Sequence, residues 1–314
     1  MSQNLLEVRD LSVRFDTPEG SVQAVDGVSF AARRGQTTCI VGESGCGKSV
    51  TALAVMGLLD RGARVTGGQV LLEGEDLLQK TPGELRAIRG SRVSMVFQEP
   101  MTSLHPLYTV GWQVEEVYRS HTDLSPRLRR QKTLEILGRG GIREPEVCAR
   151  QYPHQLSGGM RQRVMIAMAL AMAPGLLLAD EPTTALDVTI QAQVLDLMKD
   201  LKREAGTSII LITHDMGVVA DIADRVLVMY LGRIVEEADV LELFARPLHP
   251  YTQGLLESVP PLYKDVEDLP AIGGTVPLPG EIPEGCPFAP RCAYVCDRCH
   301  TWTPRLVRVG QGRR

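Results

Sequence analysis

The 314-residue sequence lacks the features that would place it inside a membrane or direct it out of the cell. No apolar run approaches the roughly 20 residues that a membrane-spanning helix needs. The first ten residues, MSQNLLEVRD, have neither a basic start nor an apolar core, so we expect no secretory signal. If this protein serves a membrane, we therefore expect it to dock on a separate membrane protein.

The sequence also lacks an excess of basic over acidic residues. The net charge of −4 at pH 7 argues against nucleic acid as the main partner, because phosphate backbones usually require a basic face. The sequence shows neither an internal repeat nor a low-complexity run. Its composition is typical of a globular protein with one or two domains.

Cysteines are few and unevenly spread. Four of the seven fall in the C-terminal part with the spacing C-x5-C-x3-C-x2-C, namely Cys286, Cys292, Cys296 and Cys299. Without an export signal we expect a reducing environment, in which clustered cysteines are more often metal ligands than disulfides. Four thiolates suit either Zn²⁺ or an iron–sulfur cluster, and the alternative is a set of free surface thiols.

The pattern of apolar runs and turns predicts an α/β fold. Strands are expected at residues 5–15, 22–32, 37–41, 69–72, 93–97, 176–179, 208–213 and 226–230, with helices at 48–59 and 190–204. The late alternation of strand and helix predicts a parallel sheet with helices on its faces. Helical patterns between residues 108 and 172 predict an inserted helical subdomain. After about residue 244 prolines become frequent, which predicts loops with one short helix.

A phosphate-binding loop is predicted where residues 42–49 fit G-x-x-x-x-G-K-[ST] between an apolar strand and a helix. Its glycines allow backbone N–H groups to surround phosphates, and the helix N-terminus adds positive potential. Lys48 would contact the β- and γ-phosphates, and the Ser49 hydroxyl would ligate Mg²⁺. The field of Lys48 and the helix also predicts a lowered pKa and high reactivity for Cys46.

Two further segments have the residue types of an ATPase. Asp180 and Glu181 end an apolar strand, where one acid can hold Mg²⁺ and the other can orient or deprotonate water. Ser157 precedes two glycines at the expected start of a helix, as a helix cap and a source of exposed N–H groups. Either segment alone would be a weak signal.

Together these segments resemble those of an ABC ATPase. The resemblance spans about residues 4–243 and includes the phosphate loop, Gln98, the LSGG signature at 156–159, Asp180–Glu181 and the histidine at 214. It implies a P-loop ATPase with a mixed core sheet, an antiparallel β subdomain, the inserted helical subdomain and a cysteine-containing extension. We expect an ATPase domain over residues 1–245 and the extension over 246–314.

The resemblance also assigns roles. Gln98 would sense Mg²⁺, Asp180 would organise it, Glu181 would be the catalytic glutamate, and His214 would contact the γ-phosphate. Signature residues would act across a dimer on the partner's ATP. The expected catalytic residues are Lys48, Gln98, Glu181 and His214. The expected Mg²⁺ ligands are Ser49, Gln98 and Asp180. The residues expected to bind ATP are Phe15, Gly42, Glu43, Ser44, Gly45, Cys46, Gly47, Lys48, Ser49, Val50, Gln98, Ser157, Gly158, Gly159, Asp180 and Asp187.

Three stretches resemble the ATPases of dipeptide and oligopeptide importers: QEPMTSLHP at 98–106, SGGMRQR at 157–163 and HPYTQGLL at 249–256. The segment GCPFAPRC at 285–292 resembles that family's cysteine-bearing extension. This resemblance implies a bacterial or archaeal importer, peripheral on the cytoplasmic face of the membrane. Its expected partners are a second ATPase subunit, two permease subunits and, indirectly, an extracytoplasmic solute-binding protein.

Several alternatives remain open on the sequence. Related importers carry nickel chelates, glutathione or murein peptides, and ABC ATPases of other classes act in nucleic-acid repair or in export. For the tail, the family resemblance implies a 4Fe–4S cluster, with Zn²⁺ as the alternative. Cys286, Cys292 and Cys299 match the first three ligands, and Cys296 or His300 would replace the fourth.

Overall fold

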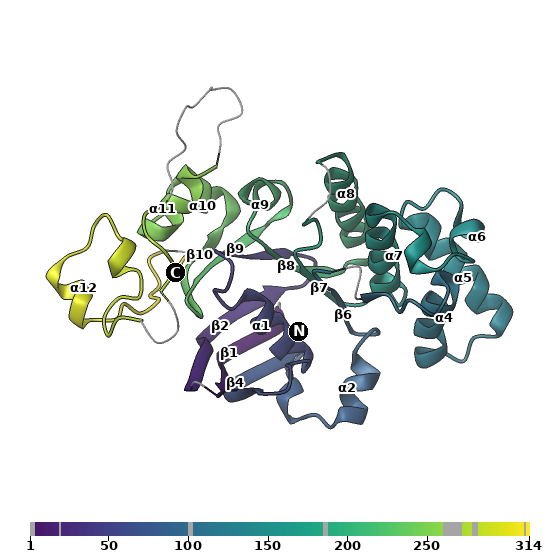
Figure 1. Cartoon of the computed structure of the whole chain (residues 1–314), viewed down its shortest axis with the longest axis horizontal. Coiled ribbons are helices and arrows are strands. Elements are labelled where there is room, and N and C mark those ends of the chain that lie inside the picture. The colour runs from purple at the N-terminus through teal and green to yellow at the C-terminus, as the bar shows by residue number, and fades with distance from the viewer. Residues whose placement is uncertain are drawn as a thin grey trace. The chain divides into compact units, whose positions relative to one another are not determined.

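The structure, a computed structural model, describes residues 4–18, 20–99, 103–184, 188–259, 272–277, 282–310 and 312–314 (Figure 1). The chain forms two compact units, each built from separated stretches of sequence. Unit 1 holds residues 1–6, 32–36 and 72–211, and unit 2 holds residues 7–31, 37–71 and 212–314. Residues 246–314, which we expected to form a separate extension, cluster with unit 2.

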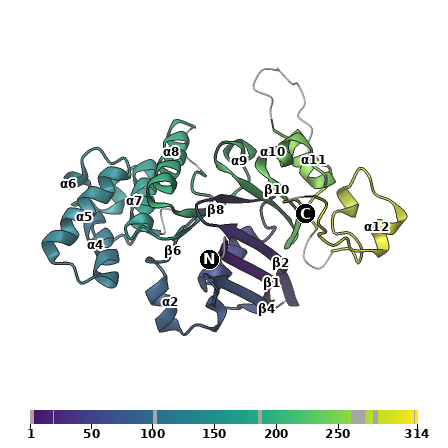
Figure 2. The same ribbon diagram turned by 180° about the vertical axis from the view of Figure 1, so that it is seen from behind.

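Unit 2 contains an antiparallel ribbon in the order β2, β1, β4, formed by β1 (Asn4–Thr17), β2 (Gly20–Arg33) and β4 (Ala63–Leu72). The three strands lie side by side in both ribbon views (Figures 1 and 2). Leu6, Leu11 and Val13 of β1 are fully buried, and the alternation of buried residues shifts by one position at Asp10, whose φ is 47°.

The same unit contains β3 (Thr37–Val41), which pairs in parallel with β9 (Arg225–Tyr230), and β10 (Arg233–Asp239), which pairs antiparallel with β9. All five residues of β3 are buried, as in a strand covered on both faces. Val41 is in register with Val228, so β3 ends near the end of β9. This pairing fixes where the following loop begins.

Unit 1 contains strands in the order β8, β7, β6, formed by β8 (Ser208–Thr213), β7 (Leu176–Asp180) and β6 (Val93–Val96). β6 and β7 are parallel, with Val96 opposite Ala179. The segments that follow these two strands therefore leave the sheet at the same edge. That edge holds Gln98 and the acids at 180–181.

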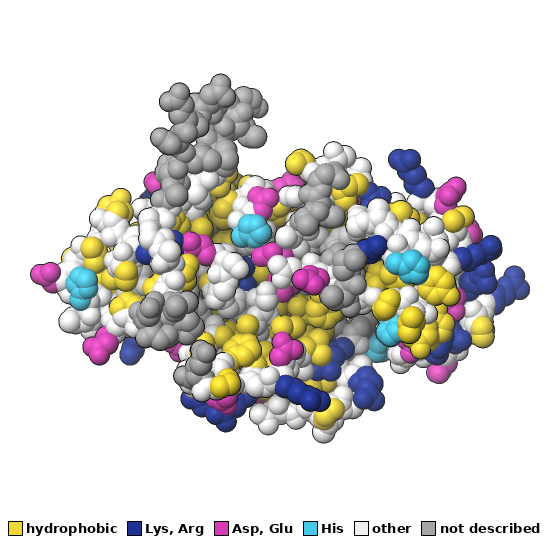
Figure 3. Space-filling model, in the orientation of Figure 1, with side chains coloured by type: hydrophobic (Ala, Val, Ile, Leu, Met, Phe, Trp, Pro, Cys, Tyr) yellow, Lys and Arg dark blue, Asp and Glu magenta, His cyan; other side chains and the backbone are white. Residues whose placement is uncertain are grey.

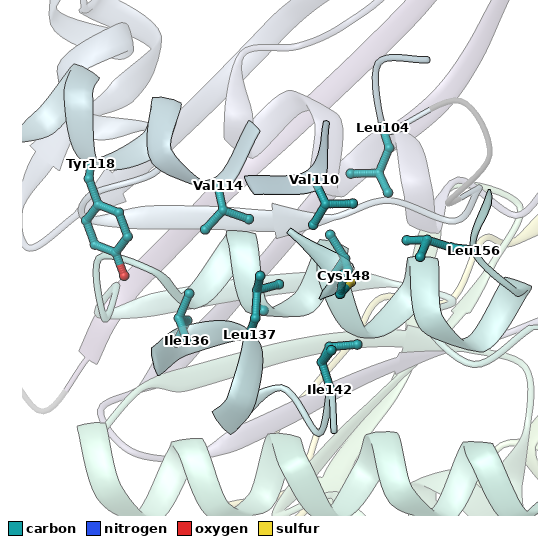
Figure 4. Close-up of a cluster of buried hydrophobic side chains, with 11 residues drawn as sticks. Leu104, Val110, Val114, Tyr118, Ile136, Leu137, Ile142, Cys148 and Leu156 are labelled. Atoms are coloured by element: carbon teal, nitrogen blue, oxygen red, sulfur yellow. The ribbon is translucent and has the colours of Figure 1, made fainter. Parts of the chain in front are cut away.

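Unit 1 also carries the inserted helices α4 (Val110–His121), α5 (Pro126–Arg139), α6 (Pro145–Cys148) and α7 (Gly158–Leu170). They have their own core (Figure 4), to which α4 contributes Val110, Val114 and Tyr118 at a spacing of four residues. The helices that the sequence predicted in this part of the chain are therefore present. Leu104 belongs to this core and is 1% exposed.

The remaining elements complete the two units. Unit 1 has α2 (Pro82–Ile88), α8 (Val188–Ala205), the short strand β5 (Glu75–Asp76) and the 3-10 turns η1 (Leu77–Gln79) and η2 (Pro153–Gln155). Unit 2 has α1 (Lys48–Met56), α9 (Met216–Ile222), α10 (Val240–Ala245), α11 (Pro250–Glu257), η3 (Ala289–Arg291) and α12 (Asp297–Thr301).

The described residues of the C-terminal part contain more helix than the proline-rich sequence predicted. We expected loops with one short helix after residue 244, but the described residues there include the helices α11 and α12 and the turn η3. Arg314 exchanges two backbone hydrogen bonds of 2.9 Å with Glu237 of β10. The prediction was wrong in part because prolines lie in the first turn of α11 and of η3, where a proline favours a helical turn.

Within the part of the chain that the structure describes, no helix combines the length and the apolar character needed to cross a bilayer.

Candidate functional site

The loop between β3 and α1 has the conformation of an anion-binding loop. Its three glycines all have positive φ, at 153° for Gly42, 80° for Gly45 and 100° for Gly47. A Cβ on Gly42 would lie 2.1 Å from the Met229 carbonyl oxygen, and one on Gly47 would lie 2.4 Å from that of Ala24. Only glycine fits at these two positions. α1 then starts at Lys48 without a side-chain cap, and the N-terminus of a helix favours an anion.

Lys48 lies in the loop as the sequence predicted. The residue is 5% exposed, and its ammonium donates hydrogen bonds to the carbonyl oxygens of Gly42 at 2.7 Å and Glu43 at 2.9 Å. These contacts keep the Lys48 ammonium next to the loop backbone, where it can bind a phosphate. Ser44 and Gly45 are exposed, and Ser49 and Val50 are half-buried in the first turn of α1.

The prediction for Cys46 was wrong. The thiol is 2% exposed, and burial raises its pKa by more than the nearby Lys48 charge lowers it. The sequence showed the cation and the helix but could not show the burial. Cys46 therefore fills a small space in the loop and is not an activated thiol.

Two residues of the C-terminal part, to which the sequence pattern gives no role, hold the phosphate loop. The hydroxyl oxygen of Tyr251 accepts a hydrogen bond of 2.8 Å from the Glu43 backbone N–H. Arg291 donates two hydrogen bonds to the Glu43 carboxylate, at 2.7 and 2.9 Å. Both residues lie in segments that resembled an importer extension, but nothing in their spacing indicated which loop they contact.

In unit 1 the structure brings Gln98 and Glu181 together. The Gln98 amide donates a hydrogen bond of 3.0 Å to the Glu181 carboxylate, and the Thr184 hydroxyl donates another, also of 3.0 Å, to the same oxygen. Glu181 has φ of 45°, a left-handed conformation that few non-glycine residues adopt. Backbone and hydrogen bonds thus orient this carboxylate, as a residue that positions water requires.

Asp180, the other acid, ends β7 and is 5% exposed. The buried Gln162 of α7 donates a hydrogen bond to the Pro182 carbonyl oxygen, which ties the signature helix to the segment after the acids. The expected Mg²⁺ ligands are the hydroxyl of Ser49, the amide oxygen of Gln98 and the carboxylate of Asp180. These are hard oxygen donors of the kind that Mg²⁺ prefers, so the residue types fit the ion.

The signature segment starts α7. Ser157 caps this helix by accepting a hydrogen bond of 3.3 Å from the Met160 N–H. A Cβ on Gly158 would meet nothing within 4 Å, whereas one on Gly159 would lie 3.1 Å from Ile190. Gly158 therefore faces open space, and Gly159 allows α8 to pack closely against α7.

Two other predicted residues, His214 and Phe15, lie within the described part of the chain. His214 is exposed directly after β8, and Asp215 caps the following helix α9. Phe15 is half-buried near the end of β1. Asp187 lies outside the described residues.

Two of the four tail cysteines, Cys296 and Cys299, have their sulfur atoms in contact. The sulfur atoms of Cys296 and Cys299 are 3.6 Å apart, and the Cys286 N–H donates a hydrogen bond of 2.7 Å to the Cys299 carbonyl oxygen. Among the residues that the structure describes, however, no three His, Cys, Asp or Glu side chains are grouped so that they could hold a metal ion. In this conformation the tail therefore does not present a complete metal site.

The cysteines should differ in reactivity in the metal-free protein. Cys296 is exposed, and a hydrogen bond from Cys299 lowers its pKa, whereas burial raises the pKa of Cys46 and Cys148. A lower pKa gives more thiolate at pH 7, so iodoacetamide should modify Cys296 at least roughly tenfold faster than Cys46. Because burial raises the pKa of Cys46, the difference should persist at pH ~8.5, where ordinary thiols ionise. Peptide mass spectrometry over time measures both rates, and equal rates at pH 7 would contradict the assignment.

Comparison with known proteins places these features in one family. Residues 25–184 match the family described as "ABC transporter", and residues 235–299 match "Oligopeptide/dipeptide transporter, C-terminal region". The chain is 52% identical over 310 residues to the oligopeptide transport ATP-binding protein AppD of Bacillus subtilis, covering 98% of this chain and 94% of that protein. It is 46% identical over 309 residues to the dipeptide transport ATP-binding protein DppD of Escherichia coli, covering 98% and 94%.

Solved structures agree with this family. A dimeric, post-hydrolysis structure of the ATP-binding cassette MJ0796 bound to ADP and Pi is 30% identical with a TM-score of 0.68, covering 75% of this chain and 98% of that one. The cbiO1 protein of Clostridium perfringens, described as part of an ABC transporter complex, is 29% identical with a TM-score of 0.65, covering 78% and 92%. These likenesses confirm the predicted α/β ATPase fold. The chain therefore belongs to the ABC transporter family, as an ATPase that carries the C-terminal region of the oligopeptide and dipeptide transporters.

Proposed function

We propose that this chain binds ATP on the phosphate loop, hydrolyses it with Glu181, and thereby drives import of dipeptides or oligopeptides through a membrane permease. The observation that carries the catalytic part is the oriented Glu181 carboxylate, held by Gln98 and Thr184. The peptide cargo rests on the relatives, which are named as peptide transport ATP-binding proteins.

In the proposed mechanism, each residue group performs one task. The N–H groups of the loop and the Lys48 ammonium bind and orient the phosphates. Glu181 orients water and accepts its proton as the water oxygen attacks the γ-phosphorus. The bond from that phosphorus to the β–γ bridging oxygen breaks, and ADP is the leaving group. His214 donates a hydrogen bond to the γ-phosphate. Ser49, Gln98 and Asp180 would hold Mg²⁺, which supplies positive charge to the phosphates. Phe15 stacks on adenine.

We further propose that the signature segment acts on ATP held by a partner ATPase subunit. Gly158 faces open space, so its backbone can approach a phosphate closely. Ser157 caps the exposed N-terminus of α7, where N–H groups favour an anion. Asp187 would link the two sites across the dimer. One solved relative is dimeric in its post-hydrolysis state, which supports the same arrangement here.

The proposed assembly places two ATPase subunits, the second a paralogue, beneath two permease subunits on the cytoplasmic face of the membrane. A solute-binding protein on the other side would deliver the peptide. Within the chain, we propose that the ATPase part ends near residue 245 and that residues 246–314 form the transporter-type extension, in line with the C-terminal family match at 235–299.

Replacement of Glu181 by Gln removes the proton acceptor but keeps the size of the side chain and the bound ATP. Hydrolysis in the assembled transporter should fall by about 10²–10⁴, the usual contribution of a general base. ATP should still bind, which a filter assay with radiolabelled ATP measures. Glu204→Gln, on an exposed glutamate paired with Arg139, is the matched control and should hydrolyse normally. Normal turnover of Glu181→Gln would remove the base assignment.

A hollow on α4 is the proposed docking site for a permease helix. Tyr108 and Trp112 stack with ring centroids 4.0 Å apart along a hollow of about 370 Å³ in unit 1. Figure 3 shows hydrophobic and histidine side chains gathered over this helix. Gln113 fixes the preceding loop by three hydrogen bonds to backbone atoms of His105 and Tyr108. The hollow is therefore a rigid, aromatic surface, of the kind that protein partners contact.

Leu107, beside Tyr108, gives a clean test of docking because it is 77% exposed. Leu107→Asp should lower transport and permease-stimulated hydrolysis on the order of tenfold, since a charge would be buried at the interface. ATP binding by the isolated subunit should not change. Leu128→Asp, on a leucine 45% exposed on α5, is the control. Leu104 is unsuitable because it is buried in the helical core, and unaltered transport by Leu107→Asp would exclude this surface.

We also propose that the tail cysteines bind a metal, as a 4Fe–4S cluster or Zn²⁺, after a local rearrangement. The Cys296–Cys299 sulfur contact and the backbone bond between Cys286 and Cys299 already place three of the four cysteines near one another. The remaining change lies in short loops, and metal binding commonly orders such segments.

Anaerobic purification followed by iron and zinc analysis tests the metal site. Stoichiometric metal is expected in the native protein, at about four irons for a 4Fe–4S cluster or one Zn²⁺. Cys299→Ser should lose most of it, because Cys299 contacts two other cysteines. Cys148→Ser, on a buried cysteine of the helical core, is the control and should retain it. A native protein without metal, whose four tail thiols titrate freely, would refute the site.

A further inference from the structure

The phosphate loop contains a carboxylate at an unfavourable place. Glu43 lies between Gly42 and Ser44, in a loop whose proposed ligand is a highly charged anion. Like charges at such short range repel strongly, and more so where the surroundings are partly buried. The Glu43 side chain is 28% exposed, so water screens it only in part.

Arg291 compensates this charge. Its two terminal nitrogens donate hydrogen bonds to both carboxylate oxygens of Glu43, at 2.7 and 2.9 Å. This two-point geometry is the strongest common form of a charged hydrogen bond in proteins. The hydrogen bonds to Glu43 raise the pKa of Arg291 above its already high ordinary value, so the guanidinium stays charged.

Arg291 is itself held in place before any ligand binds. Its side chain is 3% exposed, its Nε donates a hydrogen bond of 3.0 Å to the Gly273 carbonyl oxygen, and its guanidinium lies 5.9 Å from the centre of the Tyr230 ring. The cation is therefore a fixed part of the C-terminal fold. A mobile surface lysine would give a much weaker neutralising charge.

Tyr251 fixes the backbone of the same loop residue. The tyrosine is fully buried, and its hydroxyl accepts the Glu43 N–H at 2.8 Å. Its ring packs against Tyr230 and Phe288, with centroids 4.7 and 5.4 Å away. The C-terminal part thus holds Glu43 at both its backbone and its side chain.

We propose that Arg291 and Tyr251 are positioning residues for nucleotide binding, and that through them the C-terminal part sets the affinity of the phosphate loop for ATP. Arg291 draws the Glu43 carboxylate away from the loop and neutralises it, and Tyr251 holds the loop backbone in its binding conformation. This inference rests on the proposed function in one respect, that the loop binds ATP.

The alternative is that Arg291 is only an anchor for the tail. The two hypotheses predict different ATP affinities for a double variant, Glu43→Gln/Arg291→Ala. If Arg291 serves to cancel the Glu43 charge, removing both charges should restore ATP binding. If Arg291 is only an anchor, Glu43→Gln/Arg291→Ala should be as defective as Arg291→Ala alone.

The test measures the dissociation constant of a fluorescent ATP analogue for the full-length chain and the thermal midpoint of unfolding. Arg291→Ala should weaken ATP binding at least about tenfold, because the Glu43 charge then acts on the phosphates. Glu43→Gln is the reference for the double variant, because it removes the same negative charge while Arg291 stays in place. The double variant should bind ATP within about threefold of Glu43→Gln. The deficit of Arg291→Ala should shrink in high salt, which screens the repulsion.

Two further variants sharpen the result. Arg291→Lys keeps the charge but loses the two-point geometry, so its affinity should fall between those of the unaltered chain and Arg291→Ala. It also replaces Arg291→Ala if that variant does not fold. Arg34→Ala removes an exposed arginine that pairs with Glu73 and should bind ATP normally. In the assembled transporter, Arg291→Ala should raise KM for ATP and leave kcat nearly unchanged.

The outcomes are separable. Normal ATP binding by Arg291→Ala, or a double variant no better than Arg291→Ala, would overturn the inference while leaving ATP binding by the loop intact. An unaltered chain that binds no ATP would refute the proposed function, and this inference with it.

Discussion

The phosphate loop depends on backbone contacts so close that a side chain is excluded. Gly42 passes over the Met229 carbonyl and Gly47 over that of Ala24, at distances that no Cβ can occupy. Met229 belongs to β9 and Ala24 to β2, so one strand before the loop and one after it pack against the loop backbone. The loop is rigid because its surroundings are sheets, and this rigidity directs the N–H groups to one point.

A second constraint acts on Glu181. The residue has a left-handed backbone, which costs on the order of 1–3 kcal/mol for a side chain of this kind. Hydrogen bonds from Gln98 and Thr184 hold its carboxylate, and Gln162 holds the segment after it. Gln98 and Glu181 meet because β6 and β7 are parallel neighbours and end at the same edge. The strained backbone of Glu181 and the hydrogen bonds around it together keep its carboxylate in one orientation.

Much of this was predictable from the sequence because its signals are local. The apolar runs at β3 and β8 were predicted with their observed bounds, and the glycine spacing at 42–49 predicted the loop. What the sequence could not supply were properties that depend on distant packing. Burial reverses the expected pKa shift of Cys46, and the contacts of Tyr251 and Arg291 with Glu43 join segments more than 200 residues apart. In β10, Glu236 and Glu237 are buried and pair with arginines. Because acidic residues lower the hydropathy of this segment, its sequence did not predict a buried strand.

The interleaved course of the chain through the two units has a consequence for biosynthesis. β3 carries the loop at its end, but its partner β9 follows about 184 residues later, counted from Val41 to Arg225. At the usual ribosomal rates of about 5–20 residues per second, β3 waits roughly 10–40 s for that partner. During this interval the edge of β3 that pairs with β9 is uncovered in the nascent polypeptide, although all five residues of β3 are buried in the fold, and such an edge is a hazard for aggregation. The helices α4 to α7 form a contiguous module with its own core and are complete much earlier. Chaperone binding during translation should therefore concentrate on the N-terminal strands and end only when β9 leaves the ribosome.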